Sequence, residues 1–233
     1  MSDYSPTWYE LFLEPLAPEQ TEREVAFVAR WLPLLADAAL IDLCCGQGRH
    51  ARALARRGYR VTGVDTNAAA LAQAKRASRD EITYLQLDMR RLAELPGSFD
   101  GLICMWQSFG YFDAATNADI LRQVGAKLRP GGRLILDIYH PGFFERNQGA
   151  RRFERAGRTI AETKRMDGDR LTVMLDYGPD LPADTYAWQL FLPDDIAALA
   201  HQYGFTLLLA CANFDEATPP SAELPRMQLV LER

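Results

Sequence analysis

The chain has 233 residues, of which 48% are hydrophobic and 24% are charged, and its formal net charge at pH 7 is −5. This composition is that of an ordinary globular protein with enough apolar residues for one full-sized core. The acidic balance argues against non-specific binding of nucleic acid, which needs a basic surface. No apolar run approaches the length of a membrane span, and no signal peptide precedes the domain, so we expect a cytoplasmic protein.

The cysteines indicate a reducing compartment and no metal site. Cys44 and Cys45 are adjacent in a predicted strand and point to opposite faces, so they cannot pair easily. The chain has no Cys-x-x-Cys motif and only three histidines, so we predict no metal ligands. We therefore interpret the cysteines as small core residues.

The first 35 residues predict a cap segment followed by a helix. Prolines interrupt residues 1–18, which we expect to lie over the domain with one helical turn at Trp8–Leu13. Apolar residues at helical spacing then predict a helix over Glu19–Leu35.

Predicted strands and helices alternate over residues 36–145. We expect strands near 39–45 and at Arg60–Val64, Ile82–Leu87, Phe99–Trp106 and Arg133–Tyr139, with helices at 50–57, Asn67–Ala77 and Asn117–Leu128. Such alternation implies an α/β fold with a parallel, doubly wound sheet and right-handed crossovers.

The pattern changes after residue 145. Period-two segments predict strands at Arg152–Ala156, Thr159–Met166, Leu171–Tyr177 and Thr185–Phe191. This is too much β-structure for a simple crossover, so we expect residues 146–191 to form an antiparallel insertion beside the main sheet. Residues 192–233 then predict a closing helix from Pro193 and an antiparallel edge hairpin of Thr206–Ala212 and Met227–Leu231.

Residues 39–51 are the most informative stretch of the chain. A short apolar run carries Asp42 and ends in Gly46-Gln47-Gly48, and an amphipathic run follows at once. This order predicts a strand, a glycine turn and a helix, which is the first unit of a nucleotide-binding sheet. The glycines let the backbone turn tightly and let a ligand approach without meeting a Cβ atom.

Two ligand classes compete for this turn. Gly46-Gln47-Gly48-Arg49-His50-Ala51 fits Gly-x-Gly-x-x-Ala, the pattern of dinucleotide sites. In a dinucleotide site the helix N-terminus faces a pyrophosphate, which the nearby Asp42 carboxylate would repel. A ligand with a cationic centre and no phosphate, such as S-adenosylmethionine, tolerates this charge.

The segment Leu40–Gly48 resembles motif I of the class I S-adenosylmethionine-dependent methyltransferases, with Cys44 at a position where that family often has glycine. Ser108–Phe112 and Leu190–Ile196 resemble bacterial small-molecule members of the family. The Asp/Asn-Pro-Pro-aromatic motif of nucleic-acid amino-methyltransferases is absent after the fourth predicted strand. The resemblance implies a Rossmann-like, seven-stranded sheet that a C-terminal antiparallel hairpin closes, with S-adenosylmethionine as cofactor.

Three aspartates, Asp42, Asp65 and Asp88, fall at the carboxyl ends of consecutive predicted strands, where open α/β sheets bind ligands. By the resemblance, Asp65 binds both ribose hydroxyls and Asp88 accepts from the adenine amine. Met89 packs either on the adenine or in the core, and Arg49 is the nearest cation for the cofactor's carboxylate. The full set of expected cofactor contacts is Tyr9, Asp42, Cys44, Gly46, Gly48, Arg49, Asp65, Thr66, Asp88, Met89, Trp106 and Gln107.

Methyl transfer is an in-line displacement, so the protein must align the acceptor with the methyl group and exclude water. A base matters mainly for an acceptor that is protonated in solution. His140 follows the fifth predicted strand and is the first candidate for this base, with Tyr139 and Tyr111 next. The pattern at His140 equally predicts a structural histidine that is hydrogen-bonded in a turn. Candidates for an apolar acceptor pocket are Trp106, Phe109, Phe143, Phe144, Trp188 and Phe214.

We therefore expect one methyltransferase domain over residues 1–233, with a cofactor-binding core at 36–145 and an acceptor lid at 146–191. The expected reaction is transfer of a methyl group to an oxygen or nitrogen atom of a small metabolite. Three alternatives remain: an RNA or protein methyltransferase that docks through the arginines of 146–158, an NAD(P)-dependent oxidoreductase that would need a Tyr-x-x-x-Lys pair which the chain lacks, and a non-catalytic S-adenosylmethionine-binding protein.

Overall fold

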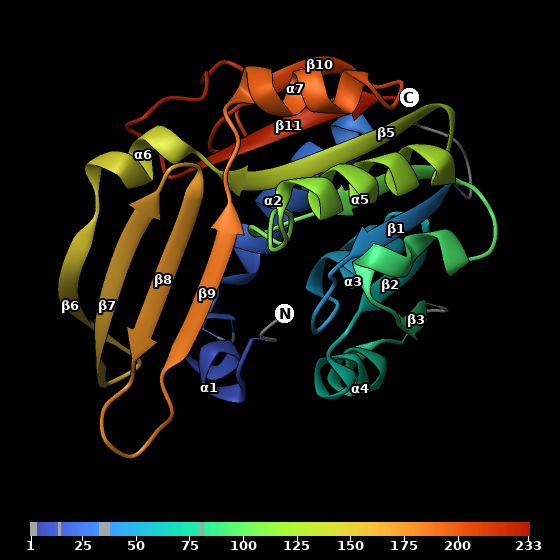
Figure 1. Cartoon of the computed structure of the whole chain (residues 1–233). Helices are drawn as coiled ribbons and strands as arrows, with labels where there is room; N and C mark the ends of the chain where they lie inside the picture. The colour runs from blue at the N-terminus through green and yellow to red at the C-terminus, as the bar shows by residue number, and fades with distance from the viewer. Residues whose placement is uncertain (1–3, 14, 33–37, 80–81) are drawn as a thin grey trace.

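The structure, a computed structural model, describes residues 4–13, 15–32, 38–79 and 82–233 and contains two β-sheets (Figure 1). Sheet A has seven strands: β1 (Ala39–Leu43), β2 (Arg60–Asp65), β3 (Thr83–Gln86), β4 (Phe99–Cys104), β5 (Leu128–Tyr139), β10 (Thr206–Cys211) and β11 (Arg226–Glu232). Sheet B has four: β6 (Gly149–Arg155), β7 (Arg158–Asp167), β8 (Arg170–Asp176) and β9 (Asp184–Gln189).

Sheet A is doubly wound, with strand order β10-β11-β5-β4-β1-β2-β3. β1 pairs in parallel with both β2 and β4, while β11 is antiparallel to both β5 and β10. The chain therefore runs outward from β1 through β2 to β3 and returns to β4 on the other side of β1. This reversal creates a switch point beside the carboxyl end of β1, where such sheets bind ligands. The predicted fold class, including the closing antiparallel hairpin, is confirmed.

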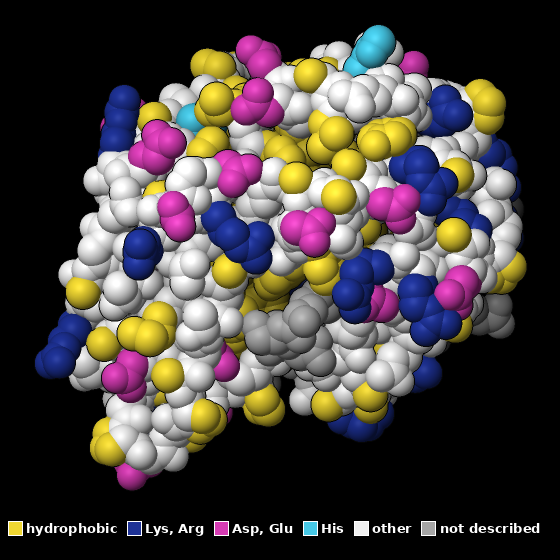
Figure 2. Space-filling view, viewed as in Figure 1, with side chains coloured by type: hydrophobic (Ala, Val, Ile, Leu, Met, Phe, Trp, Pro, Cys, Tyr) yellow, Lys and Arg dark blue, Asp and Glu magenta, His cyan; other side chains and the backbone are white. Residues whose placement is uncertain are grey.

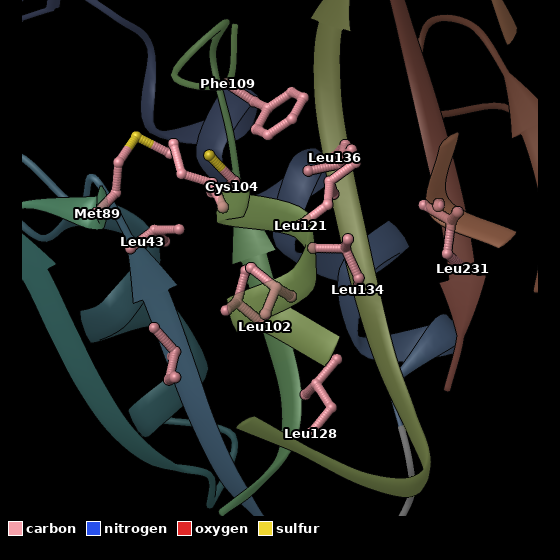
Figure 3. Packing of buried hydrophobic residues seen from close by; sticks show 14 of the residues in the cluster. Leu43, Met89, Leu102, Cys104, Phe109, Leu121, Leu128, Leu134, Leu136 and Leu231 are labelled. Carbon is pink, nitrogen blue, oxygen red and sulfur yellow. The ribbon is translucent and has the colours of Figure 1, made fainter. Parts of the chain in front are cut away.

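Helices cover both faces of sheet A. On one face lie α2 (Pro18–Trp31), α3 (Arg49–Ala55) and α4 (Ala68–Ala77), and on the other lie η2 (Met89–Glu94), α5 (Ala114–Lys127) and α7 (Pro193–His201). Successive strand residues alternate between these layers, because neighbouring side chains of a strand point to opposite faces. Leu40 and Ile103 pack in the first layer, whereas Leu43 and Leu102 pack in the second, which Figure 3 shows from close by.

Sheet B is an antiparallel meander that packs against the N-terminal segment. α1 (Pro6–Trp8) and the π-helix η1 (Tyr9–Leu13) contribute Leu11, Trp8 and Phe12 to a third hydrophobic cluster with one face of sheet B. Figure 1 shows this segment between the two sheets. The predicted antiparallel insertion is confirmed, and its first strand begins at Gly149.

Some element boundaries differ from the sequence prediction. β5 begins at Leu128, five residues before the predicted start, because the Gly131 amide and the Gly132 carbonyl hydrogen-bond to Arg233 and keep this bend within the sheet. The short helix α6 (Pro141–Arg146) was not predicted, and Pro141 occupies its first turn, where proline is favoured. The end of the helix predicted at Glu19–Leu35 lies partly outside the described residues. Within the described parts, no helix is long and apolar enough to cross a membrane.

Candidate functional site

Two cavities lie at the carboxyl edge of sheet A. The glycine-turn cavity, of about 60 Å³, is lined by Tyr4, Trp8, Tyr9, Leu13, Asp42, Cys44, Cys45, Gly46, Gln47, Arg49, His50, Met105, Trp106 and Ser108. The sheet-B cavity, of about 470 Å³, is lined by Tyr4, Trp8, Phe12, Trp106, Tyr139, Phe143, Phe144, Arg151, Arg155, Glu162, Lys164, Val173, Leu175, Tyr186, Trp188, Pro225 and Arg226. Hydrophobic side chains surround a hollow between the two sheets in Figure 2.

The glycine turn has a backbone that few residues other than glycine adopt. Gly46 and Gly48 have φ angles of 52° and 72°. A Cβ atom on Gly48 would lie 2.4 Å from the hydroxyl oxygen of Tyr84. Cys44 also has a positive φ, of 61°, in the left-handed region that favours glycine. Cys44 therefore carries backbone strain at the position where the sequence departs from the motif.

Asp42 lies near the carboxyl end of β1 and lines the same cavity as the glycine turn. Its side chain is buried, and its Oδ2 accepts a hydrogen bond from the backbone N–H of Ala51, at a distance of 3.1 Å, in the first turn of α3. Burial raises the pKa of Asp42 to about 7, against the nearby charge of Arg49 and the hydrogen bond from Ala51. The carboxyl group can therefore gain or lose its proton near neutral pH.

Asp65 at the end of β2 is fixed beside the same turn. Its Oδ2 accepts from the N–H of Gly46 at 2.7 Å, and its Oδ1 accepts from the N–H of Asn67 at 2.8 Å. The side chain is thus oriented toward the glycine turn before any ligand binds.

A buried carboxylate, Glu24 of α2, organises the other side of the glycine-turn cavity. It accepts hydrogen bonds from Gln20 at 2.7 Å, Arg49 at 2.5 Å and Trp106 at 2.8 Å, and its Oε2 lies 2.8 Å from Nε2 of His50. Burial opposes ionisation of Glu24, but these partners outweigh it and hold its pKa well below the usual range. Nη2 of Arg49 is buried and has no hydrogen-bond partner among the described residues.

Trp106 separates the two cavities. Its ring lies between two guanidinium groups, with the Cζ atoms of Arg49 and Arg226 at 4.6 and 4.8 Å from the ring centroid. Arg226 in turn pairs with buried Asp137 of β5. The φ angle of Trp106 is 58°, a strained value for a bulky residue. The cation–π contacts and the hydrogen bond to Glu24 fix the ring in the wall that both cavities share.

Part of the chain resembles known proteins in sequence. Residues 40–132 match the family model described as a methyltransferase domain. The 2-phytyl-1,4-naphtoquinone methyltransferase of Thermosynechococcus vestitus is 38% identical over 117 residues, which cover 48% of this chain and 51% of that protein. The putative methyltransferase YqeM of Bacillus subtilis is 33% identical over 103 residues, which cover 43% of this chain and 42% of that protein. The chain thus spans about half the length of the curated relatives it matches.

A solved structure extends the likeness to the whole fold. The S-adenosylmethionine-dependent methyltransferase from Clostridium acetobutylicum superposes with a TM-score of 0.80 at 14% identity, over 97% of this chain and 96% of that chain. Residues 40–132 thus resemble a methyltransferase domain, and the superposition at 14% identity shows a shared fold.

Eight of the twelve expected cofactor residues lie at the glycine-turn cavity. Tyr9, Asp42, Cys44, Gly46, Gly48, Arg49, Asp65 and Trp106 line it or form the turn at its edge. The other four lie outside its wall. Asp88 pairs with Arg90, and the Thr66 carbonyl accepts from Gln86. Met89 lies in the core of sheet A beside Leu43, so of its two readings the structure supports core packing (Figure 3).

Gln107 is buried and does not face the glycine-turn cavity. Its Oε1 accepts from the N–H of Tyr139, and its Nε2 donates to the carbonyl of Phe109 at 3.0 Å. The amide group is therefore used to join the end of β5 to the loop after β4. A contact of Gln107 with the cofactor stays a prediction, and Gln107 is not among the residues that line the glycine-turn cavity.

The expected base, His140, is not among the residues that line the two cavities. It is buried at the start of α6, and its backbone N–H donates to the carbonyl of Pro225 at 3.1 Å. Its Nδ1 has no hydrogen-bond partner in the described parts of the chain, and burial lowers its pKa. The residue follows β5 as predicted, but the turn into α6 packs its ring into the protein and not over the cavities.

The two tyrosines are closer to the expected acceptor site. Tyr139 lines the sheet-B cavity, and Tyr111 packs against Trp188 with ring centroids 5.4 Å apart. Burial raises the pKa of both phenols. Four of the six aromatic candidates for an acceptor pocket, Trp106, Phe143, Phe144 and Trp188, line the sheet-B cavity, whereas Phe109 and Phe214 belong to the two layers of sheet A.

Four further residues hold this site together and were not predicted from the sequence: Tyr4, Glu24, Asp137 and Arg226. For two of them, the sequence pattern indicates a buried charge. Glu24 lies on the buried face of α2 with Phe27 and Val28, and Asp137 interrupts the apolar strand β5. A charge on a buried face demands a partner, although the sequence does not say which. Arg226 reaches Trp106 from a distant strand and carried no local signal.

Proposed function

We propose that this protein transfers the methyl group of S-adenosylmethionine to an oxygen or nitrogen atom of a small-molecule acceptor. The observation that carries the proposal is the wall that the two cavities share, which Tyr4, Trp8 and Trp106 form. The end of a cofactor that enters the glycine-turn cavity and an acceptor in the sheet-B cavity would meet at this wall. Holding both reactants in one alignment supplies a large part of the rate enhancement of a displacement reaction.

The residues at the glycine turn fit this cofactor. The unpartnered Nη2 of Arg49 suits its carboxylate, the carboxylate of Asp65 suits the ribose hydroxyls, and Asp42 suits a cationic centre. Tyr9 lies over the turn, because a Cβ atom on Gly46 would lie 3.3 Å from its hydroxyl oxygen. When bound, S-adenosylmethionine supplies an electrophilic methyl group on a sulfonium.

The protein's own contribution is alignment and exclusion of water. Aromatic side chains form most of the shared wall and much of the sheet-B cavity. Tyr139 and Tyr111 stay protonated near neutral pH, since burial raises the pKa of each phenol. Tyr139, which lines the sheet-B cavity, is therefore a hydrogen-bond donor that can orient an acceptor. We propose proximity catalysis without a histidine base, because His140 lines neither cavity.

The dimensions of the sheet-B cavity favour a small acceptor. Its volume of about 470 Å³ is within the range of small-molecule sites. An RNA or protein acceptor would need the arginines of 146–158 as one docking surface. Three of these arginines are instead engaged with different partners in the protein. Arg146 pairs with Glu223, Arg151 pairs with Glu162, and Arg158 donates to the Tyr177 carbonyl at 3.0 Å.

The test is the size of the molecule that receives the methyl group. The purified protein is incubated with methyl-labelled S-adenosylmethionine and a cell extract separated into small molecules, RNA and protein. We expect label in the small-molecule fraction and none with the Asp65→Ala variant. Label confined to the RNA or protein fraction would contradict the small acceptor, and no transfer to any fraction would contradict the enzymatic activity.

A further inference from the structure

One face of sheet B is turned toward the acceptor cavity. Arg151 of β6 lies opposite Glu162 of β7, which lies opposite Leu175 of β8. In the same way Lys164 lies opposite Val173, and Val173 lies opposite Tyr186 of β9. Directly opposed residues share a face of a sheet, and all of these side chains line the cavity.

This face changes in character from one edge to the other. The outer strands β6 and β7 contribute charged side chains, namely Arg151, Arg155, Glu162 and Lys164. The inner strands β8 and β9 contribute apolar and aromatic side chains, namely Val173, Leu175, Tyr186 and Trp188. Neighbouring strands lie about 4.8 Å apart, so roughly 14 Å separates the two edges. Figure 1 shows β6 at the edge far from sheet A and β9 at the near edge.

The charged end has more cations than anions. Glu162 is shared by Arg151 and by Lys164, whose Nζ lies 2.9 Å from the carboxylate. Within the described residues, Arg155 has no carboxylate partner, because its Nε donates to the Leu11 carbonyl at 2.7 Å and its Cζ lies 5.1 Å from the ring centroid of Phe12. Among the described residues, the four charged side chains therefore leave two positive charges without a carboxylate partner.

The aromatic end lies beside the shared wall. Tyr186 stacks on Trp188 at 5.9 Å, and Tyr4, which lines both cavities, lies 4.8 Å from Tyr186. The N–H of Gln189 at the end of β9 donates to the Gly110 carbonyl at 2.7 Å and ties this edge to the loop after β4. A flat ring held here is close to the glycine-turn cavity, and its substituents extend toward β7 and β6.

We propose that the methyl acceptor is an aromatic molecule that carries a carboxylate or an equivalent anionic group. Its ring packs against Tyr186 and Trp188, its reacting atom lies at the shared wall, and its anionic group pairs with Lys164 and Arg155. This assignment rests on the proposed methyl transfer. A cationic amine is disfavoured, because the excess positive charge of β6 and β7 repels it.

The test compares three probes of similar shape and different charge by calorimetry, in the presence of saturating S-adenosylhomocysteine. The probes are 4-hydroxycinnamate, its neutral amide, and tyramine as a cation. We expect the acid to bind at least about tenfold more tightly than either of the others, which corresponds to one strong ion pair. Ionic strength is kept constant, because the effect is electrostatic.

Variants on the two faces of sheet B provide matched controls. Arg155→Gln and Lys164→Gln are expected to weaken the acid about tenfold and to leave the affinity for the amide unchanged. Arg152 and Arg165 are exposed neighbours on the opposite face of the same strands. Arg152→Gln and Arg165→Gln are expected to change neither affinity.

Equal affinities for acid and amide, tighter binding of tyramine, or no binding of the acid would overturn the assignment of an anionic acceptor. Equal losses in variants on both faces would overturn the role of the cavity face. A titration of the protein with S-adenosylhomocysteine alone, before any probe is added, tests the proposed function separately. If S-adenosylhomocysteine does not bind, the proposed methyl transfer is contradicted. If S-adenosylhomocysteine binds but 4-hydroxycinnamate does not, only the proposed acceptor class is contradicted.

Discussion

Two buried carboxylates at the site differ in the direction of their pKa shifts. Glu24 is surrounded by donors from Gln20, Arg49, His50 and Trp106, so its pKa is lowered in spite of burial. Asp42 accepts a single hydrogen bond that the structure gives, from Ala51, and burial raises its pKa to about 7. Glu24 therefore acts as a fixed charge that holds side chains in place, whereas Asp42 titrates near neutral pH.

The raised pKa of Asp42 predicts how cofactor affinity depends on pH. From the ordinary carboxyl pKa up to about 7, the folded protein holds a proton that the unfolded chain has lost, so the stability contribution of Asp42 falls as pH rises. A cationic ligand favours the ionised form. We expect S-adenosylmethionine to bind about tenfold more tightly at pH 8 than at pH 6. The pH dependence measured with the Asp42→Asn variant reports the ligand's own titration and is subtracted. Parallel pH profiles for the two proteins would show that Asp42 does not sense the ligand.

Asp65 gives the second prediction at this scale. If it binds both ribose hydroxyls, Asp65→Ala loses two charge-assisted hydrogen bonds, roughly 2–4 kcal/mol, and affinity for S-adenosylhomocysteine falls about 30-fold or more. Because Asp65 also accepts from Gly46, the unfolding midpoint of the ligand-free variant must be measured alongside. A well-folded Asp65→Ala protein that binds within threefold of wild type would assign the residue to the turn alone.

At the scale of elements, the sequence predicted most strands and helices because their signals are local. Period-two alternation located β7 and β8, and the glycine turn located the junction of β1 and α3. Side-chain direction after an element was less predictable. His140 follows β5 as expected, but α6, which begins at Pro141, turns its ring away from the cavities. The capping and packing of a one-turn helix depend on distant contacts that no local pattern contains.

The anchoring of β9 gives a prediction at this scale. Gly110 has a φ of 103°, and a Cβ atom on it would lie 2.4 Å from the carbonyl oxygen of Gln189. Gly97 also has a positive φ, of 88°, but a Cβ atom there would have nothing within 4 Å. Gly97→Ala should therefore cost about 1 kcal/mol from backbone strain, and Gly110→Ala a further ~1–3 kcal/mol from the clash.

Denaturant titration of the two alanine variants measures this difference. Gly110→Ala should also weaken acceptor binding more than S-adenosylhomocysteine binding, since β9 forms the aromatic end of the sheet-B cavity. Equal stabilities for the two variants would mean that β9 moves freely against the loop after β4.

At the scale of the whole molecule, the site is a product of three separate regions. Sheet A supplies the glycine turn and the strand-end aspartates, sheet B supplies the charged and aromatic face, and the N-terminal segment lies between them (Figure 1). The sequence predicted the glycine turn of the first region, because that motif is contiguous. It predicted that the insertion is β-rich, but the meeting of Tyr4 from the N-terminal segment with Trp106 and Arg226 from sheet A depends on the tertiary fold.

The most direct test of the account is an equilibrium titration of the purified protein with S-adenosylhomocysteine and, separately, with NAD. The strand-end aspartates and the cationic preference of Asp42 predict micromolar binding of S-adenosylhomocysteine and no binding of NAD, whose pyrophosphate the turn repels. Binding of NAD at micromolar concentration, with no heat from S-adenosylhomocysteine, would contradict the account at its foundation.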